Sequence, residues 1–161
     1  IKGHITLIKS IQSIIENGSK IKLRLIGSGP TLKSCKKYVI KNNLSKCIVF
    51  ENEIAHEKLN DFYNSIDLFV LPSYFEALGC VYLESWATNT PFIGIEGQGI
   101  SELIIDQDRN TILAQVQSID SLKEKILIAF NNRKSYPFNR KYDIKNTISD
   151  FLSLNIFSKY V

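Results

Sequence analysis

The chain has 161 residues, 44% of them hydrophobic, which is enough for one domain of ordinary size with a buried core. No apolar run approaches the ~18 residues of a membrane-spanning helix, and the two histidines and three cysteines lack the spacing of a zinc site. The net charge of +4 hides an asymmetry, since residues 1–50 hold ten Lys or Arg and one acid, whereas residues 51–130 hold four and thirteen. The basic residues are not interleaved with aromatic ones, so nucleic acid is not an expected partner.

Hydrophobic periodicity alternates between helix and strand along the chain, after a first helix whose buried face runs from Ile5 to Ile15. We expect strands at 22–26, 47–50, 68–71, 92–95 and 111–114, and helices at 31–42, 56–65, 79–88, 101–105 and 119–131, the last opened by a capping box at Ser121 to Glu124. This alternation predicts an α/β fold, a Rossmann-like parallel sheet with helices on both faces. Loops at the carboxyl ends of its strands should meet at one rim and form the ligand site.

The most informative segment is Pro72 to Glu84, which follows the apolar run 68–71 and places Glu76 and Glu84 eight positions apart around Gly79. The turn into a helix favours an anion, because the first N–H groups and the positive dipole end point at it. A carboxylate repels a phosphate, so the natural partners of both glutamates are hydroxyl groups on either side of that phosphate. This pattern is typical of a nucleotide sugar, which joins ribose, diphosphate and hexose.

The same residues carry a family resemblance. Roughly residues 2 to 130 contain a set of family-like features in family order, among them a strand ending in Pro-Ser and the Glu-x7-Glu spacing. The further segments are Lys2-Gly3-His4, Leu25 to Pro30, Glu84-Ser85-Trp86-Ala87, Thr90 to Gly94 and Gly97 to Glu102. Together they resemble the C-terminal, donor-binding half of group-1 retaining glycosyltransferases with the GT-B fold. The resemblance implies transfer of a hexosyl group from a UDP- or GDP-sugar to a glycan or a lipid-linked acceptor.

The resemblance also implies a role for each candidate residue. Glu76 and Lys2 are the catalytic candidates, the first holding hydroxyls of the donor sugar and the second neutralising the diphosphate. The nucleotide-binding candidates are Glu84 on the ribose hydroxyls, the backbone N–H groups of Gly79, Cys80 and Val81 on the diphosphate, Gly27 and Gly29 beside it, Ile54 in the base-binding loop 52–54, and Glu102 on the donor. No metal and no other cofactor is expected.

The domain organisation follows from the same resemblance. Residues 1–130 match the Rossmann-like domain with its first strand and a diphosphate-binding arginine missing, and residues 131–161 match a C-terminal helical segment that packs toward an N-terminal acceptor domain. We therefore expect this chain alone to be inactive. The odd number of cysteines favours a reducing, cytoplasmic setting, and the full-length enzyme could act at the cytoplasmic face of a membrane.

Other interpretations remain open at this point. Gly27-Ser28-Gly29 after a strand and Glu51 at the end of the next strand suggest a nicotinamide-dinucleotide domain, although Leu32 stands where that motif has its third glycine. A non-catalytic binding half of a larger assembly is the third interpretation. Departures from the family pattern favour it: Asn52 for a glycine, Ala77-Leu78 for Gly-Phe, and Ser101 for a proline. The glycines could serve only a tight turn, and Glu102 could serve only a helix dipole.

Overall fold

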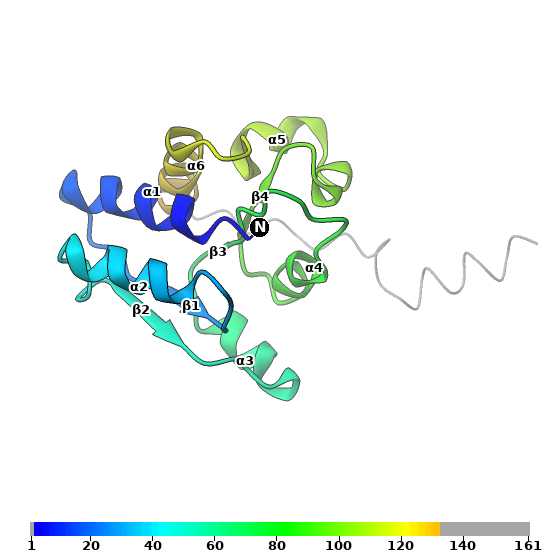
Figure 1. Ribbon diagram of the computed structural model, residues 1–161. Helices are drawn as coiled ribbons and strands as arrows, with labels where there is room; N and C mark the ends of the chain where they lie inside the picture. The colour runs from blue at the N-terminus through cyan, green and yellow to red at the C-terminus, as the bar shows by residue number, and fades with distance from the viewer. Residues whose placement is uncertain (1, 133–161) are drawn as a thin grey trace, which may run out of the picture.

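The computed structural model of the chain describes residues 2–132, which fold as alternating helices and strands (Figure 1). The helices are α1 (His4–Glu16), α2 (Leu32–Lys41), α3 (Leu59–Asn64), α4 (Cys80–Ala87), α5 (Asp106–Ile112) and α6 (Ile119–Asn132), with short 3-10 helices η1 (His56–Lys58) and η2 (Gly99–Glu102). The strands are β1 (Leu23–Ile26), β2 (Ile48–Glu51), β3 (Phe69–Val70), β4 (Phe92–Ile95) and β5 (Leu113–Ala114). The predicted alternation is confirmed.

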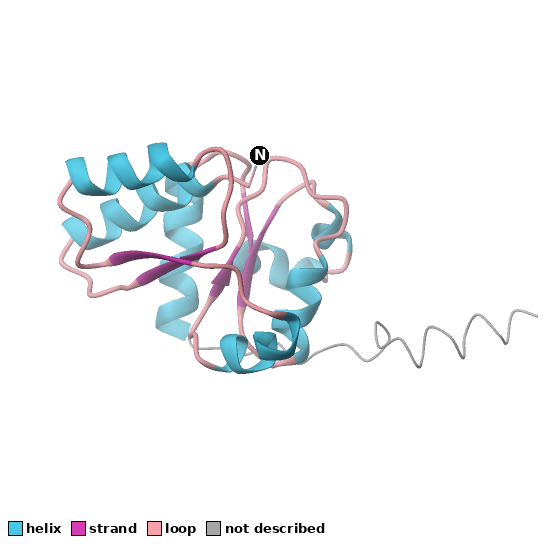
Figure 2. Ribbon diagram, turned by 60° about the horizontal axis from the view of Figure 1, so that its bottom comes forward, coloured by secondary structure: helices cyan, strands magenta, loops and turns pink. Residues whose placement is uncertain are grey.

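All strand pairs are parallel, as predicted, but they form two groups instead of one sheet. β1 pairs with β2 in the register Leu23 to Ile48, while β4 lies between β3 and β5. No hydrogen-bonded ladder joins β1 to β3 within residues 2–132. Figure 2 shows the two groups side by side with helices packed around them. The fold class is that of a Rossmann-like α/β domain whose strands are divided into two groups, and the boundary between these groups is called the junction below.

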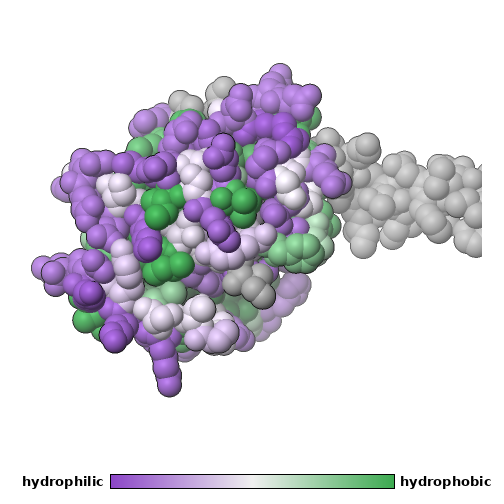
Figure 3. Space-filling view, turned by 45° about the horizontal axis from the view of Figure 1, so that its top comes forward, coloured by the Kyte–Doolittle hydropathy of each residue, from purple (hydrophilic) through white to green (hydrophobic). Residues whose placement is uncertain are grey.

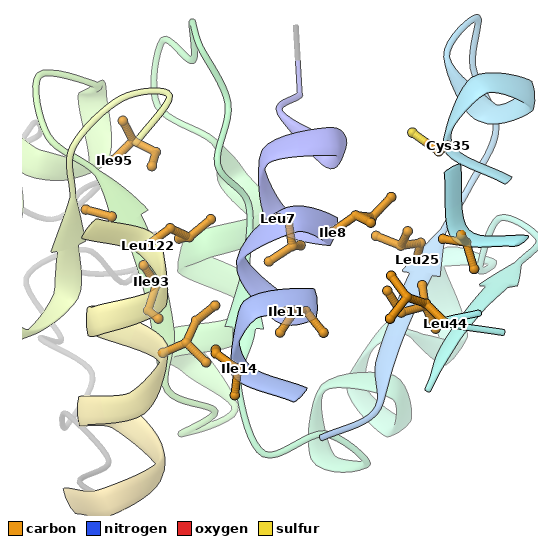
Figure 4. Packing of buried hydrophobic residues seen from close by; sticks show 14 residues of the cluster. Leu7, Ile8, Ile11, Ile14, Leu25, Cys35, Leu44, Ile93, Ile95 and Leu122 are labelled. Carbon is orange, nitrogen blue, oxygen red and sulfur yellow. The ribbon is translucent and has the colours of Figure 1, made fainter. Parts of the chain in front are cut away.

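Helix α1 holds the two groups of strands together. Its buried face presents Leu7, Ile8, Ile11 and Ile14, and Figure 4 shows these side chains between Ile93, Ile95 and Leu122 on one side and Leu25 and Leu44 on the other. Ile8 and Ile14 are completely buried. Burial of an aliphatic side chain of this size contributes about 1.5–3 kcal/mol, so α1 is a main source of the stability of the junction.

A second core, rich in aromatic residues, lies under β3, β4 and α4. Tyr82 and Trp86 project from α4 and pack on Phe92, with ring centroids 5.4 and 5.8 Å apart, and Phe69 packs edge-on against Tyr82. Trp86 is buried. The tyrosine hydroxyl donates to the Leu71 carbonyl, which ties α4 to the end of β3. This core therefore fixes the segment that carries Glu76 and Glu84.

Two local predictions differ from the structure. The helix expected at 101–105 is instead η2 followed by α5, whose sequence Asp106–Ile112 has Ile112 as its one buried residue and therefore shows no apolar period. Helix α6 is capped by Ser118, whose Oγ accepts a hydrogen bond from the Ser121 N–H, and not by the predicted box at Ser121. Ser121 lies inside α6, where its Oγ accepts from the Gln115 N–H. The helical segment predicted for residues 131–161 lies, after Asn132, outside the described residues.

In the described part of the chain, no helix combines the length and the apolar character that a membrane crossing requires.

Candidate functional site

The start of α1 lies against the loop that follows β3 (Figure 1). Gly3 has a left-handed backbone, with φ of 70°, and a Cβ built on it would lie 1.9 Å from the Pro72 carbonyl oxygen. Because no side chain fits this gap, glycine is required at position 3. The Thr6 and Tyr74 hydroxyls are 3.3 Å apart and add a polar contact between the same two segments. Lys2 is thereby fixed beside the loop 72–79.

Lys2 and Glu76 form an ion pair in this loop, with 2.5 Å between Nζ and Oε2. The Glu76 side chain is 17% exposed and that of Lys2 is 50% exposed. A Cβ built on Gly79 would lie 3.0 Å from the Glu76 Cγ, so the carboxylate-bearing side chain passes over the residue that precedes α4. The first N–H groups of α4 have no acceptor within the helix. A cation, a carboxylate and free N–H donors therefore meet at one point.

The loop that carries Glu76 is braced by the segment after β4. The Gln98 side chain accepts a hydrogen bond from the Glu76 N–H at 2.6 Å and donates to the Tyr74 carbonyl at 3.3 Å. The Gly99 N–H donates to the Glu76 carbonyl, and a Cβ on Gly99 would lie 1.6 Å from the Ala77 carbonyl oxygen. The motif at residues 97–102 does not by itself predict that Gln98 supports the Glu76 loop, because nothing local in the sequence indicates its partner.

Arg109 extends this brace into α5. Its guanidinium donates to the Ser101 carbonyl at 2.7 Å and pairs with Glu96. Both partners lie in the segment between β4 and the end of η2, so α5 holds that segment in place. This role could not be predicted from the sequence, since Arg109 follows three polar residues in a stretch without periodicity.

Glu84 lies on α4 and is half-buried. The Tyr63 hydroxyl, from α3, donates to Glu84 Oε2 at 3.0 Å and lies 3.2 Å from the Val81 carbonyl. Burial, and then the hydrogen bond to Glu84, raise the pKa of the Tyr63 phenol well above its usual range. Tyr63 stays a donor at neutral pH. Periodicity predicts a helix at Tyr63, but no motif in the sequence indicates a function for this residue.

Lys2, Gly27 and Gly29 line a common cavity of about 320 Å³ at the carboxyl end of β1. Its walls are mainly apolar and include Leu25 and Phe50. His4 also lines it, and burial, together with nearby positive charge, lowers the pKa of its imidazole. The structure thus brings Lys2 together with the predicted Gly27–Gly29 turn, which lies far from it in the sequence.

A second cavity, of about 330 Å³, is lined in part by the same Gly27–Ser28 turn. Asn52 and Glu53 line it, and the Ser28 hydroxyl donates to Glu53 at 2.7 Å across the gap between the two loops. Ile54, predicted to contact the base, is half-buried and does not line this cavity. Of the loop 52–54 that is predicted to contact the base, only residues 52 and 53 line this cavity.

Two other acidic residues behave differently from the Glu76–Glu84 pair. Glu102 is exposed in η2 and makes no hydrogen bond or ion pair with a described residue, so the structure does not join it to Lys2 and Glu76. Glu51 uses both carboxylate oxygens on Arg24, at 2.6 and 2.8 Å, and these hydrogen bonds hold the pKa of its carboxyl below the usual range. Glu51 is thus engaged where a nicotinamide-dinucleotide domain needs a carboxylate open to ribose.

One face of the molecule is mostly polar. On the face shown in Figure 3, hydrophobic side chains form separate groups within a largely hydrophilic surface. In the loop beside Glu76, Phe75 is 74% exposed. Within residues 2–132, His, Cys, Asp and Glu side chains form no group of three that could hold a metal ion.

Comparison with known proteins agrees with this architecture. Residues 1–146 match the family described as glycosyl transferases group 1. An uncharacterized glycosyltransferase of Methanocaldococcus jannaschii is 33% identical over 133 residues, which cover 83% of this chain and 36% of that protein. The chain belongs to the group 1 glycosyltransferases, and it spans about a third of the length of this curated relative.

Solved structures show the same fold. The C-terminal domain of a group 1 glycosyltransferase (LpcC) from Francisella tularensis has a TM-score of 0.72 and 23% identity, covering 91% of this chain and 78% of that domain. HepE from Anabaena, in complex with UDP and glucose, has a TM-score of 0.72 and 17% identity, covering 94% of this chain and 45% of that one. The chain therefore has the fold of the C-terminal half of a GT-B glycosyltransferase.

Proposed function

We propose that this chain is the donor-binding domain of a retaining glycosyltransferase that moves a hexosyl group from a nucleoside-diphosphate sugar to a glycan or a lipid-linked acceptor. The observation that carries the proposal is the meeting of Lys2 and Glu76 at the start of α4, with Glu84 further along the same helix. A cation and free N–H donors suit a diphosphate, and the flanking carboxylates suit sugar hydroxyls. The Anabaena structure that shares this fold binds UDP and glucose.

Each part of the donor then has a partner in the chain. The ribose hydroxyls donate to Glu84, and the diphosphate accepts from the N–H groups of Gly79, Cys80 and Val81. Hydroxyls of the hexose donate to Glu76. The base occupies the cavity beside Asn52 and Glu53, and the Gly27–Gly29 turn lets the backbone approach the phosphates.

The chemical contribution of these residues is stabilisation of the leaving group. Negative charge grows on the diphosphate as the glycosidic bond breaks, and Lys2 and the N-terminus of α4 are placed to stabilise it. In this proposal no metal ion is needed for that step. Glu102, which is exposed on η2, is assigned a contact with the donor.

The remaining parts of the reaction lie outside the chain. We propose that an N-terminal domain binds the acceptor and closes over the donor, excluding water, and that residues 1–161 alone transfer no sugar. The enzyme is assigned to the cytoplasm, with its acceptor presented in solution or at the cytoplasmic face of a membrane.

A thermal-shift panel tests the proposal. UDP, GDP, ADP and NAD are each added to residues 1–161 with EDTA present. A ligand at ten times its Kd should stabilise the fold by about 1.4 kcal/mol, and we expect UDP or GDP to do so in the absence of metal. A shift with NAD and none with any nucleoside diphosphate would overturn the proposal, and a shift that requires added divalent metal would overturn its metal-free part.

A further inference from the structure

Tyr63 is held in one position by contacts on every side. It is 3% exposed, and its ring packs on Phe62 and edge-on against Phe69, with centroids 5.4 and 5.6 Å away. The Thr90 hydroxyl donates to the Tyr63 backbone carbonyl at 2.9 Å. The ring and the backbone therefore leave the phenol hydroxyl little freedom.

The fixed hydroxyl is directed at α4. It lies 3.0 Å from Glu84 Oε2 and 3.2 Å from the Val81 carbonyl, so it joins α3 to α4 at the level of the carboxylate. The Glu84 carboxylate makes no other hydrogen bond within residues 2–132, so Oε1 has no partner among the described residues. One carboxylate oxygen is thus held by the protein while the other is available to a ligand.

We infer that Tyr63 is a positioning residue that fixes the Glu84 carboxylate for the ribose hydroxyls of the donor. The inference rests on the proposed function, because it takes the ribose site as given and adds the residue that orients its carboxylate. A glutamate has several rotatable bonds, and ordering such a side chain costs free energy. Tyr63 supplies that order before the ligand arrives, and the gain appears as ligand affinity.

The test compares two ligands with two variants. Tyr63→Phe removes the hydroxyl and keeps the ring, and calorimetry measures binding of UDP and of 2′,3′-dideoxy-UDP to residues 1–161, with GDP and its dideoxy form as the second pair. We expect Tyr63→Phe to weaken the ribose-bearing nucleotide about three- to tenfold and to leave the dideoxy nucleotide unchanged. The control is Tyr38→Phe, which removes a comparable hydroxyl bond, to Gln12 Oε1 at 2.8 Å on α1, and should change neither affinity.

A double-mutant cycle separates positioning from a general structural effect. If Tyr63 acts through Glu84, Tyr63→Phe should have no further effect on UDP affinity in a Glu84→Ala background, which lacks the acceptor of the Tyr63 hydroxyl. Thr90→Val provides a second variant, since it removes the bond to the Tyr63 carbonyl and keeps the phenol. It should give a smaller loss, again confined to the ribose-bearing nucleotide.

The outcomes are distinct. Unchanged UDP affinity in Tyr63→Phe, or equal losses for UDP and dideoxy-UDP, overturns this inference and leaves the donor site standing. Failure of the unmodified chain to bind any nucleoside diphosphate overturns the proposed function, and this inference with it.

Discussion

Glu76 and Glu84 lie on either side of Gly79 and are held by two different kinds of contact. Glu76 stands on a loop and pairs with Lys2, whose side chain is half-exposed. Glu84 stands on α4 and accepts a hydrogen bond from Tyr63, which is almost completely buried. An exposed ion pair exchanges partners at little cost, whereas a buried hydrogen bond is costly to break. The difference indicates that the Glu84 carboxylate is already held in position before a ligand binds, while Glu76 and Lys2 can separate when a ligand enters.

The largest expected effect comes from disturbing the support of the Glu76 loop. Gly99→Ala drives a Cβ into the Ala77 backbone, which cannot yield as a side chain could. We expect the free energy of unfolding to fall by about 3 kcal/mol, the upper end of the range for overpacking. Urea denaturation measures it. Gly97→Ala is the control, because it meets no atom within 4 Å and suffers only the strain of its φ of 75°, about 1 kcal/mol. Equal losses in the two variants would show that the loop does not rest on Gly99.

Glu84→Ala comes next and probes the preset carboxylate. Loss of a charged acceptor should weaken UDP or GDP and the corresponding nucleotide hexose alike, by about 2 kcal/mol. Calorimetric titration of both ligands, with circular dichroism to confirm folding, measures the change. Glu16→Ala, at the end of α1, serves as the control and should bind as the unmodified chain does. If Glu84→Ala binds both ligands as tightly as the unmodified chain does, Glu84 does not bind the ribose hydroxyls.

Glu76→Ala should change the affinities of the two ligands by different amounts. We expect the nucleoside diphosphate to bind within about twofold of the unmodified chain, because its hydroxyls do not reach Glu76. The nucleotide hexose should lose about 1 kcal/mol, the value of a typical hydrogen bond. The same titrations measure this, and equal losses for both ligands would place Glu76 on the diphosphate side of the site and end the contrast with Glu84.

The smallest effect is expected from Lys2→Gln. The Lys2–Glu76 pair is exposed on the lysine side, so its removal should change the free energy of unfolding by less than about 1 kcal/mol. The change should vanish at about 1 M salt, where charges are screened within a few ångströms. Denaturation at low and high salt measures both. A large loss that persists at high salt would mean that the pair is a structural contact and not an exchangeable one.

Much of the fold could be predicted because its signals are local. The alternation of apolar helices and short apolar strands, ending in loops such as 72–79, gave the parallel α/β class and the rim on which Lys2, Gly27 and Glu76 meet. Helix α5 was missed because a polar helix with one buried residue has no apolar period. The division into two groups of strands depends on which strands pair, and no single segment encodes that.

The supports of the candidate site could not be predicted for a similar reason. Tyr63 lies 21 residues before Glu84, and Gln98 lies 22 residues after Glu76; each is one polar or aromatic residue among many in its segment. Their functions depend on where the backbone places them. The roles assigned to Glu76, Glu84 and Lys2 toward a donor stay predictions until the titrations are done.

The packing of α1 has a consequence for how the domain forms. The Ser10 hydroxyl donates to the Ile119 carbonyl, across a sequence separation of 109 positions. The Lys123 ammonium donates to the Ser13 hydroxyl, across a separation of 110 positions. Contacts of such sequence separation form late and slow folding, because a long loop must close first. In a growing chain, α1 can pack on Leu25 and Leu44 early, whereas the part of its apolar face that α6 covers stays exposed until Leu122 has been made.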